Sequence, residues 1–383
     1  MTTAAPATGS NLLARGAVIA TAMMFGLTYS LSAALIALDL AERGLSEAAI
    51  GANAAMHALG ILATAMVLPR VVAAFGVRPL ILGALGLAAL TLVGFPLMPL
   101  VWLWFPLRFI LGIASETLFV LSETWINSLS TEETRARAMA TYTAALSVGF
   151  ALGPLILSII GTAGALPYLI GAGLALFSAL FVASPRIEAP VFDKPSHSNP
   201  IHYMRLAPLA LSATLLNAGL EAAGLSFLAI YAVNVGWSEG DATRLITCMM
   251  VGAILLQLPI GWLGDKMDRR KLVILLAIIA TLGALAWPLT MGHEWAAYAL
   301  LFVWGGSFVG VATIMLTVVG SRFKGGELVG IYAVMGLVWG GGALVGPLAA
   351  GMAMQVSVHG LAYVAALACG GFALASILLK RGA

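Results

Sequence analysis

The sequence predicts an all-α integral membrane protein with twelve transmembrane helices in two pseudo-repeats of six. Of its 383 residues, 61% are hydrophobic and only 9% are charged, whereas about a quarter of the residues of a soluble domain carry charge. A bilayer accommodates such a chain, because a spanning helix takes about 20 mostly apolar residues and satisfies its own backbone hydrogen bonds. An alternation of basic residues and an internal repeat support the helix count.

Apolar runs between charged and turn-forming clusters define the helices in order. The third and fourth helices are divided only by the stretch 95–104, which contains two prolines and is therefore a poor helix. The predicted ranges are 13–38, 46–68, 78–98, 101–127, 137–160, 165–184, 207–235, 242–263, 271–291, 295–319, 328–354 and 359–379.

The positions of lysine and arginine test this count and predict the orientation. One set of alternate connections and chain ends carries sixteen basic residues, while the other set carries only Arg43 and Arg244. Basic residues are retained on the cytoplasmic side, so we expect a multi-pass membrane protein with both termini in the cytoplasm. Several tryptophans fall near the predicted outer interface, as in an aromatic belt: Trp102, Trp104, Trp237, Trp287 and Trp295.

A polar segment rich in proline divides the chain into two bundles. It begins at Pro185 and reads PRIEAPVFDKPSHSNPIHYMRLAP, a composition that disfavours a helix. The predicted domains are residues 1–184, a cytoplasmic linker at 185–206 and residues 207–383. The pattern GFALGP of the fifth span recurs as GALVGP in the eleventh, 193 residues later. Two six-helix halves are typical of transporters whose bundles alternate around a central site.

The most specific local pattern is GWLGDKMDRRK, residues 261–271, after the eighth span. It resembles the loop motif G-x-L-a-D-r-x-G-r-r of the major facilitator superfamily, with Asp268 where a glycine is usual. In that family the aspartate pairs with helix ends and basic residues across the two halves, so the resemblance implies gating roles for Gly261, Asp265, Arg269 and Arg270. The alternative, a basic cluster that only sets topology, explains the arginines but not the glycine and aspartate spacing.

The repeated GP pattern resembles the fifth-helix motif of the same family. Glycines four residues apart let two helices approach closely, and a proline bends a helix, so the pattern predicts a hinge at the bundle interface. Tight packing without motion is the alternative. The residues concerned are Gly149, Gly153, Pro154, Gly342, Gly346 and Pro347.

The fourth span carries the densest charge that we expect inside the membrane. A charged side chain at mid-bilayer costs at least about 2.5–3.5 kcal/mol, so it marks a functional site by default. Glu116 and Glu123 are seven residues apart and share one helix face. Glu116 is the better candidate for a proton or substrate site, whereas Glu123 could instead hold the cytoplasmic loop. Arg108, four residues before a glycine, resembles the family's fourth-helix motif, which is linked to proton coupling.

Other polar and aromatic residues are weaker candidates for the central cavity. Asn217 and Glu221 share a face of the seventh span, and the resemblance places that helix at the centre of the fold. Asn53 and His57 share a face of the second span, where a hydrogen bond between helices is the commoner role for a histidine. The last candidates are equally consistent with core packing: Tyr29, Gln257, Trp304 and Trp339.

Longer stretches resemble one bacterial branch of the superfamily, the YcaD-type permeases, which is similar to copper and riboflavin importers. The stretches are RFILGIASETLFVLSETW, ILLQLPIGWLGDKMDRR and LVGIYAVMGLVWGGGALVGPLAAGMAMQ. A copper path needs grouped thioether, thiolate or imidazole ligands. No two of the sixteen methionines lie four residues apart, which disfavours a copper or metal importer.

These observations predict a secondary active transporter that moves a small organic solute by alternating access and is coupled to protons. A non-transporting sensor on a transporter fold is the alternative, and it is disfavoured because no long soluble segment is appended. No nucleophile–base pair, phosphate-binding loop or metal cluster is recognisable, so an enzyme is not expected. The expected partners are the solute, protons and the lipid bilayer, with no cofactor, metal or nucleic acid, and the protein is expected to be a monomer.

Overall fold

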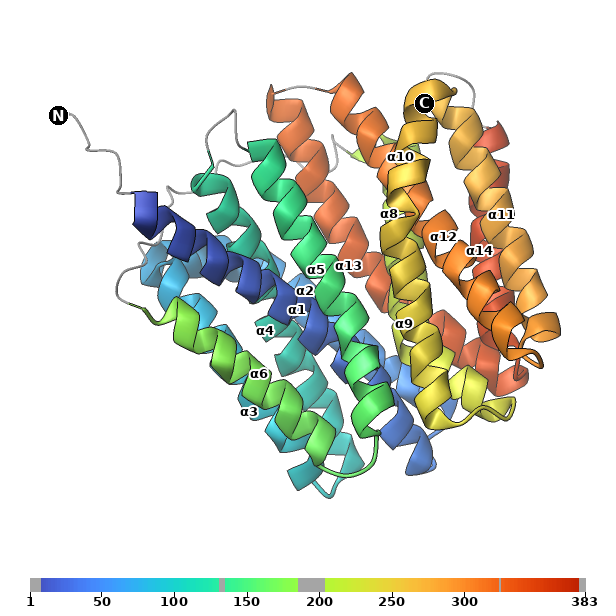
Figure 1. The fold of residues 1–383 in the computed structure, drawn as a ribbon, viewed down its shortest axis with the longest axis horizontal. Helices are drawn as coiled ribbons and strands as arrows, with labels where there is room; N and C mark the ends of the chain where they lie inside the picture. Colours follow the sequence, from blue (N-terminus) through green and yellow to red (C-terminus); the bar gives the residue numbers. More distant parts are fainter. Residues whose placement is uncertain (1–7, 131–134, 185–203, 324, 379–383) are drawn as a thin grey trace. The chain divides into compact units, whose positions relative to one another are not determined.

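The fold of the protein is given by a computed structural model that describes residues 8–130, 135–184, 204–323 and 325–378 (Figure 1). Within these ranges every regular element is a helix. Most of the predicted linker, residues 185–203, lies outside the described residues.

The first half of the chain contributes six long helices and one short 3-10 turn. The third helix ends before Met98 and the fourth begins after the short turn, as the two prolines of that stretch predict. The elements are α1 (Thr8–Glu42), α2 (Glu47–Phe75), α3 (Val77–Leu97), η1 (Val101–Leu103), α4 (Trp104–Ser128), α5 (Arg135–Ile160) and α6 (Leu166–Val182).

The second half contributes the remaining helices. They are α8 (Pro208–Asn234), α9 (Glu239–Leu255), α10 (Gln257–Lys266), α11 (Arg269–Thr290), α12 (Glu294–Arg322), α13 (Gly325–Val356) and α14 (Gly360–Leu378). Within the described residues, 11 spans are long and apolar enough to cross a membrane, counting Glu239–Lys266 as one. The helix α6 is apolar but shorter, and it occupies the place of the predicted sixth span. The all-helical membrane fold is therefore confirmed.

The eighth span differs from the prediction because it consists of two helices. Helix α9 ends at Leu255 and α10 begins at Gln257, with Leu256 between them. Pro259 has no backbone N–H, so it cannot donate to the carbonyl of Leu255, and its ring crowds that carbonyl. The sequence therefore contained the signal for this break.

The helices group into two compact units by their contacts. Unit 1 contains Met1–Ser32 and Leu59–Pro195, and unit 2 contains Ala33–Ala58 and Ser196–Ala383. The end of α1 and the beginning of α2 thus belong with α8, α9 and α13 in unit 2. Close contacts support this grouping, since a Cβ atom at Gly51 would meet the carbonyl oxygen of Pro347.

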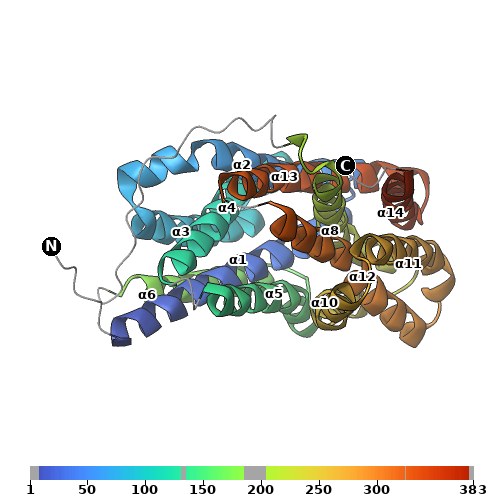
Figure 2. The same cartoon turned by 90° about the horizontal axis from the view of Figure 1, so that it is seen from above.

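The two copies of the GP pattern make equivalent close crossings. In unit 1, a Cβ atom at Gly149 would collide with the carbonyl of Met23, so α5 packs backbone to backbone on α1, which lies beside it in Figures 1 and 2. In unit 2, a Cβ atom at Gly346 would collide with the backbone of Gly219, so α13 packs on α8 in the same way. The predicted close approach of helices is present in both copies; motion at these crossings stays a prediction.

An arginine makes a second pair of equivalent contacts. In unit 1, Arg78 at the start of α3 donates hydrogen bonds to the carbonyls of Ala183 and Ser184, just beyond α6. In unit 2, Arg270 at the start of α11 donates to the carbonyls of Ser376 and Ile377 at the end of α14, the first at 2.8 Å. A cation at the carbonyl end of a helix is favourable. Both units use this contact to hold their last helix.

Candidate functional site

Glu116 and Glu123 lie on one face of α4 in unit 1, two turns or about 10 Å apart along the helix axis. Both side chains are half-buried within a membrane-spanning segment, and they interact electrostatically. Neither forms an ion pair with another described residue, because the ion pairs of the described chain involve other side chains. Two carboxylates so placed repel each other and need a compensating positive charge.

Tyr142 of α5 completes this cluster, and the sequence did not single it out. Its Oη lies 3.1 Å from the Oγ of Ser122 and donates to the carbonyl of Phe119 at 3.3 Å. The phenol also interacts electrostatically with Glu116 and Glu123. The signal for it was modest, since Tyr142 is one tyrosine in an otherwise small and apolar helix.

An aromatic cluster lies beside these polar groups. The ring of Phe25 is 5.1 Å from Phe119 and 5.9 Å from Phe150, and Tyr29 is 5.6 Å from Phe150, between ring centroids. The cluster joins α1, α4 and α5. Tyr29 was predicted to line a cavity, and the structure places it in this packed cluster, which is the alternative role considered for it.

Arg108 lies on the same helix, α4, about two turns before the first of the two glutamates. It precedes Glu116 by eight residues on α4, about 12 Å along the axis. Its side chain is only 3% exposed, and its Nη1 donates to the Oγ of Ser32 at 3.1 Å. The structure gives it no carboxylate partner among the described residues, so Arg108 and the glutamates are separate sites within unit 1.

A second carboxyl group lies on α8 in unit 2. Glu221 accepts a hydrogen bond of 3.4 Å from the Nδ2 of Asn217, as expected for residues one turn apart. Both side chains are half-buried. No ion pair links Glu221 to any residue within the described ranges.

The first part of α2 lies close to this region of α8. Ala58 packs with Ala222 and Ala343, and Trp339 packs against the three alanines. This contact brings the neighbouring His57 to the level of Glu221. Asn53 and His57 are almost fully buried. Five of the predicted residues therefore belong to unit 2: Asn53, His57, Asn217, Glu221 and Trp339. Asn217 and Glu221 are joined by a hydrogen bond, and Trp339 packs against Ala222, next to Glu221.

Two other predicted cavity residues have packing roles. Gln257 follows the break between α9 and α10, accepts a hydrogen bond of 2.7 Å from Thr313 and donates to the carbonyl of Ala253. Its amide therefore stabilises the broken helix against α12. Trp304 is buried, donates to the carbonyl of Ala280 and packs edge to face against Trp287, with ring centroids 4.7 Å apart. These contacts favour the packing alternative for Gln257. Trp304 is packed in the same sense, but one side of it also lines an apolar cavity of unit 2, as predicted.

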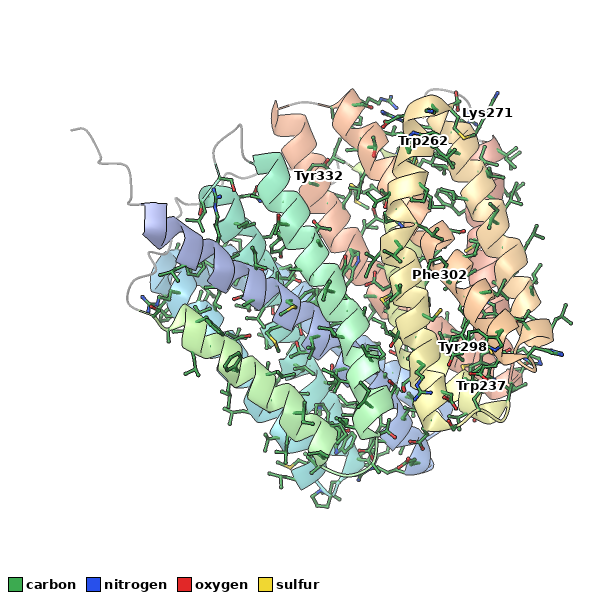
Figure 3. The ribbon with its side chains drawn as sticks, in the orientation of Figure 1. Trp237, Trp262, Lys271, Tyr298, Phe302 and Tyr332 are labelled. Atoms are coloured by element: carbon green, nitrogen blue, oxygen red, sulfur yellow. The ribbon has the colours of Figure 1, made fainter. Side chains whose placement is uncertain are left out.

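The basic loop after α10 lies at one end of unit 2. Figure 3 shows Trp262 and Lys271 at this end and Trp237 and Tyr298 at the opposite end. Asp265 is exposed and makes no hydrogen bond or ion pair with any other described residue, so the latch implied by the resemblance is not formed within the described chain. Its gating role stays a prediction.

The other residues of this loop have structural contacts. Asp268 accepts a hydrogen bond of 3.0 Å from the backbone N–H of Lys271 and caps the start of α11. This explains an aspartate where the family usually has glycine, because aspartate is a favourable N-cap. Arg269 donates to the Oγ of Ser321 at 3.1 Å. A Cβ atom at Gly261 would meet nothing within 4 Å, so packing does not require glycine there.

The comparisons with known proteins identify the family. A family model described as Major Facilitator Superfamily matches residues 17–202 and 209–382. The chain belongs to this superfamily. Among curated members, the "Uncharacterized MFS-type transporter YfkF" of Bacillus subtilis is 26% identical over 267 residues. The chain spans 65% of the length of that relative.

Solved structures of the superfamily share the fold. A mutant of the nucleoside transporter NupG has a TM-score of 0.80 at 14% identity, covering 97% of this chain and 100% of that one. The D-xylose-proton symporter has a TM-score of 0.75 at 15% identity, covering 97% of both chains. Identities this low show the fold alone, and the YcaD-type branch stays a prediction.

Proposed function

We propose that this chain is a secondary transporter of the bacterial inner membrane that moves a small organic solute by alternating access and couples the movement to protons. Both termini lie in the cytoplasm in this proposal. Membership of the superfamily supports a transport function, and solved structures of the same fold include a nucleoside transporter and a D-xylose-proton symporter. Those solutes belong to those two proteins, so the class of solute proposed for this chain is argued from the residues of its own site.

The pair of carboxyl groups on α4 carries the proposal of proton coupling. Glu116 and Glu123 interact within a membrane-spanning segment and have no cationic side chain as partner among the described residues. A proton can supply the missing positive charge and is released when the group meets water. A group that changes its proton occupancy as it faces each side in turn is the element that coupling requires.

The surroundings of the pair fit an organic solute. Phe119, the half-buried member of the aromatic cluster, offers apolar surface, and the half-buried carboxyl groups of Glu116 and Glu123 offer hydrogen bonds. Phe25, Tyr29 and Phe150 are buried and support the ring of Phe119. Ligand sites commonly combine such a wall with a few polar groups.

The first experiment identifies a solute. The purified protein is screened by thermal shift against nucleosides, sugars, flavins and metal salts, because a ligand that binds the native state raises its apparent stability. A hit is then tested for uptake into proteoliposomes with and without an imposed proton gradient.

The coupling is tested with Glu116→Gln, which keeps the shape of the side chain but cannot exchange a proton. We expect gradient-driven uptake to be lost while counterflow of solute persists. Glu294→Gln is the matched control, because Glu294 is exposed at the start of α12. Full uptake by Glu116→Gln with an unchanged dependence on the gradient would refute the assignment.

A further inference from the structure

Unit 2 contains an apolar cavity that includes none of the candidate charged or amide residues, although the candidate Trp304 lines it. Its volume is about 390 Å³, within the range of roughly 300–1,000 Å³ typical of ligand cavities. Residues of α8, α11, α12, α13 and α14 line it, and nearly all are alanine, glycine, leucine, valine or aromatic, with Ser212 as the hydroxyl-bearing exception. An occupant must therefore be apolar over most of its length.

This cavity is separate from the carboxyl group on α8. Gly219 and Ala223 line it, and Glu221 lies two residues from each of them. At 100° per residue, Glu221 points to the opposite face of α8. The cavity and the proposed coupling group therefore use different sides of one helix.

The cavity is a groove that opens to the surroundings of the helices. Among its lining residues, Leu215 is 45% exposed and Val345 is 56% exposed. All of its lining residues belong to segments that are long and apolar enough to span a membrane, so the hydrocarbon of a surrounding bilayer can reach the exposed part of the groove. The groove runs beside the close crossing of α8 and α13, where the glycines Gly219, Gly342 and Gly346 line it together with larger apolar side chains.

The length of the groove fits one acyl chain. On α14 the lining runs from Leu361 to Ala375, about 21 Å along a helix axis. The hydrocarbon of a bilayer is about 30 Å thick, so the chain of a lipid in one leaflet reaches roughly half of that. An acyl chain that enters at one end of the groove is therefore short enough to lie inside it along its full length.

One end of the groove carries positive charge. Arg270 donates to the carbonyl of Ser376, one residue beyond the lining residue Ala375. Arg205 is exposed three residues before the start of α8, the helix whose residue Ser212 lines the same end. A basic residue beside the membrane surface attracts anionic lipid headgroups.

We propose that this groove binds a phospholipid with an anionic headgroup, whose acyl chain lies between α8, α13 and α14 and whose phosphate lies at the basic end near Arg205 and Arg270. These three helices pack against one another in unit 2 (Figure 2). The lipid fills the seam between α8 and α13 on the side away from Glu221. The proposal does not depend on which solute is transported.

The test uses the full-length protein purified in a mild detergent and mixed with phosphatidylglycerol or phosphatidylcholine of the same chains, with bound lipid counted by native mass spectrometry. Gly371→Leu fills the groove, and a Cβ atom there meets nothing within 4 Å, so the fold tolerates it. The matched control is Gly336→Leu, another open glycine, which lies on α13 outside the groove lining. Ala368→Leu, which also lines the groove, is the second filling variant if the first does not fold.

We expect the wild type and Gly336→Leu to retain phosphatidylglycerol and the filling variant to lose at least about tenfold in affinity, since each methylene that is no longer buried weakens binding about fourfold. Arg205→Gln is expected to reduce the preference for phosphatidylglycerol while phosphatidylcholine binding is unchanged. Equal retention by all variants would overturn the site, and equal binding of the two lipids by the wild type would overturn the anionic headgroup. If a transported solute loses its thermal shift in Gly371→Leu, the groove belongs to the solute and the lipid assignment is wrong.

Discussion

Tyr142 shows how a single residue can organise a charged site without carrying charge. Its hydroxyl group links α5 to Ser122 and to the carbonyl of Phe119 on α4, between the two glutamates in sequence. These hydrogen bonds fix how α5 is aligned along α4 at the level of Glu116 and Glu123. The packing of α4 against α5 therefore also determines the surroundings of the two carboxyl groups.

Tyr142→Phe is expected to destabilise the protein by about 1 kcal/mol, the usual net value of a buried hydrogen bond. Thermal or denaturant unfolding in detergent measures the loss. Ser122→Ala is the companion variant, because it removes one partner and leaves the contact with the carbonyl of Phe119. A Tyr142→Phe protein as stable as the wild type would show that the hydroxyl group does not hold the helices together.

Glu221 is the second residue whose proton occupancy the proposal requires. Glu221→Gln is expected to weaken gradient-driven uptake and, because the side chain keeps its shape, to leave the fold intact. Asn217→Ala removes the 3.4 Å hydrogen bond within α8 and should cost about 0.2–0.5 kcal/mol, as is typical of a side-chain pair one helical turn apart. Uptake into proteoliposomes separates the two variants. If they lose uptake equally, the hydrogen bond matters and the proton does not.

The helices of this chain are held together at crossings where only glycine fits. At Gly346 a Cβ atom would collide with the backbone of Gly219, and backbone cannot move aside as a flexible side chain can. Gly346→Ala is therefore expected to destabilise unit 2 by about 1–3 kcal/mol, the usual cost of overpacking. Measurement is by thermal unfolding in detergent.

The control for this crossing is Gly336→Ala on the same helix, where a Cβ atom meets open space. It should be neutral or stabilising by up to about 1 kcal/mol, because alanine is the better helix former. Destabilisation of similar size in both variants would mean that helix flexibility, and not the crossing, sets the cost.

The sequence predicted the elements well because the bilayer imposes one length and one composition on each helix. It could not predict which side chains meet. The break at Leu256 had a signal in Pro259, but Gln257 was assigned to a cavity because only the fold shows Thr313 opposite its amide. Asp268 was noted only as a departure from the motif, although its role as an N-cap is local and could have been predicted.

Equivalent contacts occur in the two units at about the same spacing as the internal repeat of the sequence. Arg78 and Arg270 are 192 residues apart and hold the last helix of each unit in the same way. The repeat does not extend to the glutamates, since unit 1 has its carboxyl groups on α4 and unit 2 has its own on α8. The two units therefore share their packing contacts but not the positions of their carboxyl groups.

Asp265 is expected to change the balance between the inward-open and outward-open states of the molecule. Asp265→Asn should change the accessibility of the basic end of unit 2, because the resemblance implies that this carboxylate stabilises one state. Cysteine labelling measures the change, with Ser321→Cys at the end of α12 introduced into a protein from which Cys248 and Cys369 have been removed.

Asp268→Asn is the matched control, since it removes the same charge three residues away. It keeps the capping hydrogen bond to the N–H of Lys271, because asparagine caps a helix as well as aspartate does. We expect the labelling rate at position 321 to change in Asp265→Asn and to stay at the parent value in Asp268→Asn. A similar change in both would assign the effect to the charge of the loop, and the motif would then serve topology and not gating.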